Sequence, residues 1–104
     1  MAKQKYEVTV SDAAFAMLDR HMDFLARASK NAAVRVKNEI LADMRSLREN
    51  PQRYPIYESR FITEARYHKL FSAKRYLVLY EIVGHAVYVD YIVDCRQDYE
   101  LFVR

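Results

Sequence analysis

The stretch RYLVLYEIVGHAVYVDYIVD, residues 75–94, decides the fold of this chain. Its two halves, Arg75 to Val83 and Ala86 to Asp94, are rich in β-branched and aromatic residues and predict two strands. Gly84-His85 separates the halves, and Gly84 stands where a tight hairpin turn requires a positive φ. The stretch therefore predicts a β-hairpin.

Apolar side chains alternate along the second strand of this hairpin. With a period of two residues, one face of that strand is expected to carry Val87, Val89, Tyr91 and Val93. Two further strands are expected, one at Lys5 to Val10 and one at Ala65 to Phe71.

The segment between the first two strands predicts a helical hairpin. Ser11 is the expected N-cap of a first helix that runs to about Ala28, because apolar residues recur there at three- and four-residue spacing. Either Ser29 or Asn31 caps a second helix, which Asn50-Pro51 ends.

The predicted element order is β-α-α-β-β-β, which indicates the α+β class. A helical hairpin packed on one face of a mostly antiparallel sheet buries the apolar sides of all these elements. The other face of the sheet is then at least partly exposed. The chain of 104 residues has room for one core, so residues 1–104 are expected to form a single domain.

Net charge and cysteine content indicate the kind of partner and the cellular compartment. The net charge is +3, which favours a polyanionic or acidic partner. The single cysteine, Cys95, excludes an internal disulfide and fits a reducing compartment. The first residues hold no apolar run of the length that a signal peptide or membrane span needs, so a cytoplasmic protein with no membrane contact is expected.

Metal and nucleotide-cofactor chemistry find no support in the residue pattern. The three histidines, His21, His68 and His85, are scattered and have no metal-ligand spacing to Cys95. A phosphate-binding glycine loop is excluded, because the chain has one glycine. No metal and no cofactor are expected.

The strand segment Arg66-Tyr67-His68-Lys69-Leu70 offers a different chemistry. On a strand, Arg66 and His68 share one face, and Tyr67 and Lys69 share the other. Cleavage of RNA by its own 2′-hydroxyl needs a base, an acid and cations for the phosphate, and these residue types supply them. The same residue types are also typical of a solvated strand and of ordinary sheet packing. Without further information, the residues therefore indicate a small basic α+β domain, and RNA binding is one of the functions that such a domain can have.

Short motifs in a fixed order resemble one protein family over nearly the whole chain. They are SDAA (11–14), LRENP (47–51), RYHKL (66–70), KRYLVLYEI (74–82) and VYVDYIVDCRQDY (87–99). In this order and spacing they resemble the RelE/ParE superfamily of bacterial toxins. The resemblance implies the microbial-ribonuclease-like α+β fold and a type II toxin that a cognate antitoxin neutralises, usually by wrapping an amphipathic segment around it.

The resemblance leaves three functions open. RelE-like members cut messenger RNA on the ribosome, and the first interpretation is such an endoribonuclease. ParE-like members inhibit DNA gyrase and are not nucleases, and this is the alternative. A third interpretation is an inactive relative that serves only as a binding module.

The endoribonuclease interpretation assigns roles to particular residues. The candidate catalytic residues are His68, Lys69, Arg96 and Tyr99. The candidate phosphate-binding residues are Arg66, Lys69, Lys74 and Arg75. By resemblance, Lys69 matches a strand lysine, Arg96 matches the arginine after the last strand, and Tyr99 lies near the place of the tail tyrosine.

One position departs from the RelE pattern. RelE has an arginine directly after the tyrosine that corresponds to Tyr76, and this chain has Leu77 there. Arg75 comes one residue before the tyrosine and is expected to face the other side of the sheet.

Overall fold

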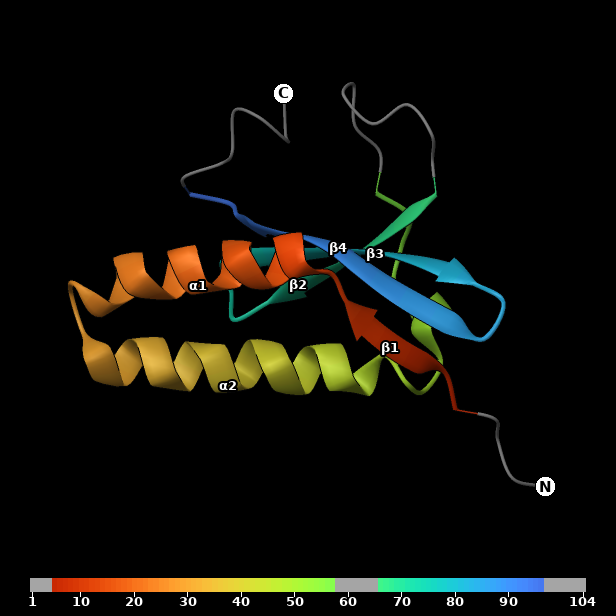
Figure 1. The fold of residues 1–104 in the computed structure, drawn as a ribbon, viewed down its shortest axis with the longest axis horizontal. Helices are drawn as coiled ribbons and strands as arrows, with labels where there is room; N and C mark the ends of the chain where they lie inside the picture. Colours follow the sequence, from red (N-terminus) through yellow and green to blue (C-terminus); the bar gives the residue numbers. More distant parts are fainter. Residues whose placement is uncertain (1–4, 58–65, 97–104) are drawn as a thin grey trace.

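The chain folds as two helices packed on one face of a four-stranded sheet (Figure 1). The computed structural model describes residues 5–57 and 66–96. Within these ranges the elements are β1 (Glu7–Val10), α1 (Asp12–Ala26), α2 (Lys30–Ser46), the 3-10 helix η1 (Pro51–Arg53), β2 (Tyr67–Ser72), β3 (Tyr76–Val83) and β4 (Ala86–Asp94). The predicted α+β class and the β-α-α-β-β-β order are confirmed.

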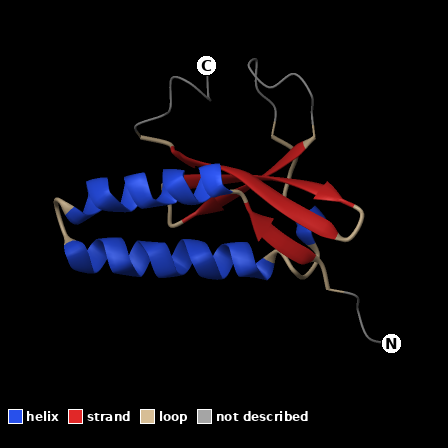
Figure 2. Cartoon of the chain, in the orientation of Figure 1, coloured by secondary structure: helices blue, strands red, loops and turns tan. Residues whose placement is uncertain are grey.

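The sheet is mixed and mostly antiparallel, as predicted. Its strand order is β1-β4-β3-β2, and the helices form a separate layer against it (Figure 2). β2 pairs with β3 and β3 pairs with β4 in antiparallel fashion, whereas β1 pairs with β4 in parallel. The first strand of the sequence therefore lies at an edge of the sheet, beside the last one.

A serine side chain caps the N-terminus of each helix. Ser11 Oγ accepts a hydrogen bond from the Ala14 N–H at 3.0 Å, as the sequence predicted. Ser29 Oγ accepts from the Ala32 N–H at 3.1 Å, which decides between the two residues expected to cap the second helix.

The second helix ends earlier than predicted. α2 stops at Ser46 rather than at Asn50-Pro51, and Pro51 instead begins the 3-10 helix. Asn50 lies between them with a φ of 54°, in the left-handed region that asparagine tolerates better than most residues. Within residues 5–57 and 66–96, no helix is long and apolar enough to cross a membrane.

The main core lies between the helical hairpin and the sheet. Leu18 of α1 and Ile40 of α2 are at most 1% exposed and meet Val78 and Tyr80 of β3. The Tyr80 hydroxyl donates to the Pro51 carbonyl oxygen at 2.6 Å, and burial raises the pKa of Tyr80. This hydrogen bond fastens the 3-10 helix to the centre of the sheet.

The hairpin between β3 and β4 contains one irregularity. Gly84 has the predicted positive φ, at 60°. The register pairs Leu79 with Tyr91 but Tyr80 with Val89, so Asp90 is an extra residue in β4. The interruption is a β-bulge.

The bulge reverses the faces of β4 beyond it. Val87 and Val89 pack in the core beneath the helices, whereas Tyr91 and Val93 pack on the opposite face of the sheet. The expectation that all four side chains share one face is therefore wrong, because the extra residue shifts the two-residue alternation by one position.

The face of the sheet away from the helices is partly covered, as expected. A second cluster of buried side chains lies there, made of Tyr57, Tyr67, Leu77, Leu79 and Val93. At the edge of the same face, Phe71 of β2 is 59% exposed and Lys69 is exposed.

The capping of α1 gives a prediction for stability. Replacing Ser11 with Ala removes the acceptor of the Ala14 N–H and is expected to lower the free energy of unfolding by about 1 kcal/mol. Ser11→Asp keeps an acceptor and adds negative charge at the helix N-terminus, so it is expected to retain the stability. Urea unfolding followed by circular dichroism measures both variants, and equal losses in the two would contradict the capping role.

Candidate functional site

His68 and Lys69 lie on opposite faces of β2. The His68 ring faces the helices and stacks on Tyr80, with centroids 5.4 Å apart and planes inclined by 16°. His68 Nδ1 lies 2.8 Å from the Tyr54 carbonyl oxygen, so one ring nitrogen is already engaged. Lys69 is exposed on the other face. These two candidate catalytic residues are therefore not brought together.

Arg66 precedes β2 instead of lying on it. Its Nε is 3.1 Å from Glu81 Oε2, and its guanidinium lies over the Tyr67 ring at 5.3 Å from the centroid. Tyr67 and Glu81 belong to the face away from the helices. The expectation that Arg66 shares a face with His68 is wrong, because the alternation of a strand does not extend to a residue before it.

The bulge residue Asp90 contacts Tyr67 on the sheet face that points away from the helices. The Tyr67 hydroxyl donates to Asp90 Oδ2 at 2.7 Å, and the Tyr67 and Tyr91 rings meet edge to face at 5.8 Å. Burial raises the pKa of Tyr67, and the hydrogen bond to Asp90 raises it further. Asp90 was not predicted as a site residue, because a single acid in an alternating strand has no distinguishing pattern.

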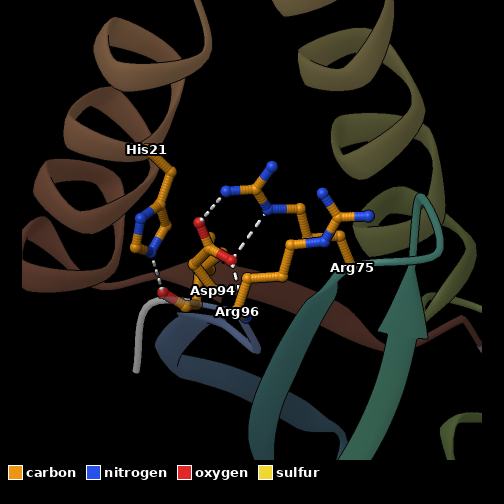
Figure 3. A network of polar contacts seen from close by, with 5 residues as sticks. His21, Arg75, Asp94 and Arg96 are labelled. Carbon is orange, nitrogen blue, oxygen red and sulfur yellow. Dashed lines mark hydrogen bonds and ion pairs between the residues drawn. The ribbon is translucent and has the colours of Figure 1, made fainter. Parts of the chain in front are cut away.

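An ion pair between Arg75 and Asp94 ties the turn before β3 to the end of β4 (Figure 3). Arg75 Nε donates to Asp94 Oδ1 at 2.8 Å, and Nη2 donates to Oδ2 at 2.7 Å. The Asp94 side chain is 1% exposed and that of Arg75 is 16% exposed. Hydrogen bonding to Asp94 raises the pKa of Arg75. The predicted phosphate-binding Arg75 is thus largely committed to a partner within the protein.

This pair lies on the side of the sheet that faces the helices. Ile92 belongs to the core beneath the helices, and Asp94 follows it by two residues. The Arg75 guanidinium also lies 5.5 Å from the centroid of the Tyr76 ring. The expectation that Arg75 faces away from the tyrosine is therefore wrong, because Arg75 lies in a turn and its long side chain reaches back over Tyr76.

Arg96 and His21 complete this polar end of the sheet. The Arg96 N–H donates to Asp94 Oδ1 at 2.9 Å, and the Arg96 guanidinium extends beside that of Arg75 (Figure 3). His21 of α1 is 4% exposed, and its Nε2 lies 2.7 Å from the Ile92 carbonyl oxygen. Lys74 is exposed in the neighbouring turn, with a φ of 60°. We call Arg75, Asp94 and Arg96 the Asp94 cluster.

Within the described part of the chain, the site residues predicted from the sequence thus lie in different parts of the fold and do not form one site. The Asp94 cluster contains Arg75 and Arg96, whereas Arg66, His68 and Lys69 lie elsewhere on β2 or beside it, on two faces. Tyr99 lies outside the described residues. Asp94 and His21 were not predicted as site residues, since their contacts join elements that are distant in sequence.

A groove of about 500 Å³ runs between β1 and α2. Its lining combines an apolar floor with a mostly basic rim, from Lys5, Tyr6, Glu7, Val8, Val10, Leu41, Met44, Arg45 and Arg48. Glu7 N–H donates to the His85 carbonyl and Ser11 N–H donates to that of Val89, both toward β4. The N–H groups of Val8 and Val10 therefore point toward the outer edge of the sheet. The groove thus lies along the edge of β1 that pairs with no other strand in the described part of the chain, and the Tyr6 N–H before β1 donates to the Arg48 carbonyl oxygen at 2.8 Å.

Comparisons with known proteins agree with this architecture. Residues 8–99 match the family model described as ParE toxin of type II toxin-antitoxin system, parDE. Among solved structures, the chain is similar to one described as chromosomal ParDE TA system from P. aeruginosa, with 13% identity and a TM-score of 0.72. That match covers 88% of this chain and 98% of the other. No curated protein matches the sequence.

The protein is therefore a toxin of a type II toxin–antitoxin pair, and this class implies a cognate antitoxin as its partner. The chain belongs to the ParE toxin family of parDE systems, and thereby to the RelE/ParE superfamily that its motifs resemble.

The buried ion pair predicts a large loss of stability. Asp94→Asn keeps the shape of the side chain but leaves the Arg75 guanidinium without its counter-charge, and is expected to lower the free energy of unfolding by about 3 kcal/mol. Glu81→Gln is the matched control, because Glu81 pairs with an Arg66 side chain that is 53% exposed. The control is expected to lose less than about 1 kcal/mol. Equal losses in urea unfolding would contradict the structural role of Asp94.

Proposed function

We propose that this toxin inhibits DNA gyrase by binding it, and that it does not cleave messenger RNA. The observation that carries the proposal is the separation of the candidate catalytic residues. His68 faces the helices and stacks on Tyr80, whereas Lys69 lies on the opposite face. A general base and a phosphate-binding cation have to reach the same nucleotide, and these two side chains do not.

The Asp94 cluster supports the same proposal. The Arg75 guanidinium donates two hydrogen bonds to a buried carboxylate, which leaves it less able to bind a phosphate in bidentate fashion. The position after Tyr76 holds Leu77, which is 8% exposed, where RelE has an arginine. The family match of the chain to ParE toxins also favours gyrase as the target over messenger RNA.

The second candidate function is the ribosome-dependent endoribonuclease. It is favoured by Arg96, which is exposed at the position of the RelE arginine after the last strand, and by Lys69. In that function Arg96 would neutralise the phosphate, and a proton would have to be moved by His68 or by Tyr99.

Expression of the toxin without its antitoxin separates the two functions. We expect covalent gyrase–DNA cleavage complexes to accumulate and reporter messages to remain intact. His68→Ala, which removes the candidate base, is expected to leave toxicity unchanged as long as the variant folds. Circular dichroism of the purified variant checks the fold.

Two results would count against gyrase inhibition. Messages cut in a translation-dependent manner, with cutting abolished in folded His68→Ala, would establish the endoribonuclease. Normal growth at full expression of the folded chain would instead indicate an inactive binding module.

We also propose that the groove between β1 and α2 receives the cognate antitoxin. The outward N–H groups of Val8 and Val10 offer hydrogen bonds to an added strand, and the apolar floor accepts its alternate side chains. Lys5, Arg45 and Arg48 on the rim favour acidic residues in that segment.

Charge reversal on the rim tests this placement. The double variant Arg45→Glu and Arg48→Glu is expected to weaken antitoxin binding by about tenfold or more, because like charges then face each other. Lys37→Glu is the matched control, since Lys37 is exposed on α2 but does not line the groove. Isothermal titration calorimetry with the purified antitoxin measures the affinities. Unchanged binding in the double variant, or an equal loss in the control, would contradict the placement.

A further inference from the structure

The Asp94 cluster is built around one buried carboxylate. Asp94 is buried and accepts hydrogen bonds from Arg75 Nε, Arg75 Nη2 and the Arg96 N–H. The Cys95 N–H in addition donates to the Arg75 carbonyl oxygen at 2.9 Å. The backbone at Cys95 and Arg96 is therefore held by two consecutive N–H hydrogen bonds, one to the Arg75 carbonyl oxygen and one to the Asp94 carboxylate.

The side chain of Arg96 is the part of this cluster that is open to a ligand. Arg96 is exposed, and its guanidinium makes no hydrogen bond or ion pair with residues 5–57 or 66–96. It extends beside the Arg75 guanidinium, which is oriented by Asp94 (Figure 3). Two guanidinium groups thus lie together at one end of the sheet, one fixed and one available.

A buried hydroxyl lies next to the same cluster. Tyr76 is 1% exposed, and its hydroxyl has no hydrogen-bond partner among residues 5–57 and 66–96. Its ring lies between His21, at 5.7 Å between centroids, and the Arg75 guanidinium, at 5.5 Å from the ring centroid. Burial raises the pKa of Tyr76, which favours the protonated phenol, a hydrogen-bond donor with no acceptor in the described part of the chain.

The charge of the cluster favours a single carboxylate over a nucleic acid. Two arginines and one aspartate leave one formal positive charge unneutralised. A nucleic-acid strand is held by a track of cations that follows its phosphates. The cations of the described part of β2 and its flanks do not form such a track. Lys69 lies on the other face, Arg66 is paired with Glu81, and Lys74, exposed in the turn before Arg75, is a single further cation.

We propose that the Asp94 cluster is a docking site for an acidic side chain of a partner protein, with Arg96 binding the carboxylate beside Arg75. This inference rests on the proposed function, in which the toxin acts through contacts with proteins. The planar guanidinium of Arg96 offers charge-assisted hydrogen bonds to both oxygens of a carboxylate, and Asp94 positions the Arg96 backbone by accepting its N–H. Asp94 is a positioning residue in this arrangement.

The test uses the full-length toxin labelled with nitrogen-15 and a capped tetrapeptide that contains two glutamates. We expect the Arg96 Nε–H resonance to shift saturably as the peptide is added. Arg96→Gln is expected to weaken peptide binding, followed at the Arg75 Nε–H resonance, by about tenfold. Arg35→Gln, which removes an exposed arginine on α2, is the matched control and is expected to bind the peptide as the unchanged chain does.

A hexameric single-stranded RNA is the competing probe. It is expected not to displace the peptide, and displacement would overturn the proposal in favour of a nucleic-acid site. No saturable shift, or an equal loss in Arg96→Gln and Arg35→Gln, would also overturn it. The readout does not involve gyrase, so failure of the gyrase proposal would be seen separately, in the cleavage-complex experiment.

Discussion

The extra residue at Asp90 in the pairing of β3 with β4 is the constraint on which the polar end of this molecule depends. Before the bulge, Val87 and Val89 fill the core beneath the helices; after it, Tyr91 and Val93 turn to the other face. The same shift brings Asp94 to the side of the helices, where Arg75 and the Arg96 N–H meet it. Without the bulge, the strand alternation would direct Asp94 to the opposite face, away from His21 and Tyr76.

Features with local causes were predictable from the sequence. The cap at Ser11 and the turn at Gly84 each depend on a few neighbouring residues, and both are found as predicted. The bulge was not predictable, because apolar residues alternate on both sides of Asp90 without interruption. The pairs of Arg75 with Asp94 and of His21 with the Ile92 carbonyl depend on register and helix packing, which no short motif encodes. Of the candidate site residues, Arg75 and Arg96 are brought together, whereas His68 and Lys69 are separated by the sheet.

The surroundings of the two arginines bear on which function this fold supports. An arginine after the last strand is shared with the RelE pattern, but here a buried aspartate neutralises its neighbour and the histidine of β2 is packed against Tyr80. Cleavage of RNA needs several groups converging on one phosphate, whereas docking on a protein needs only complementary charge and shape at each contact. The groove along β1 and the Asp94 cluster lie on different elements, so the proposed antitoxin groove and the proposed carboxylate-docking site use different parts of the surface.

Direct binding of the purified toxin to purified DNA gyrase tests the central claim that this toxin works by contact rather than by cleavage. Isothermal titration calorimetry is predicted to show saturable binding with a defined stoichiometry, and the same affinity for folded His68→Ala. Absence of binding, together with cleavage of messenger RNA on purified ribosomes, would contradict the account.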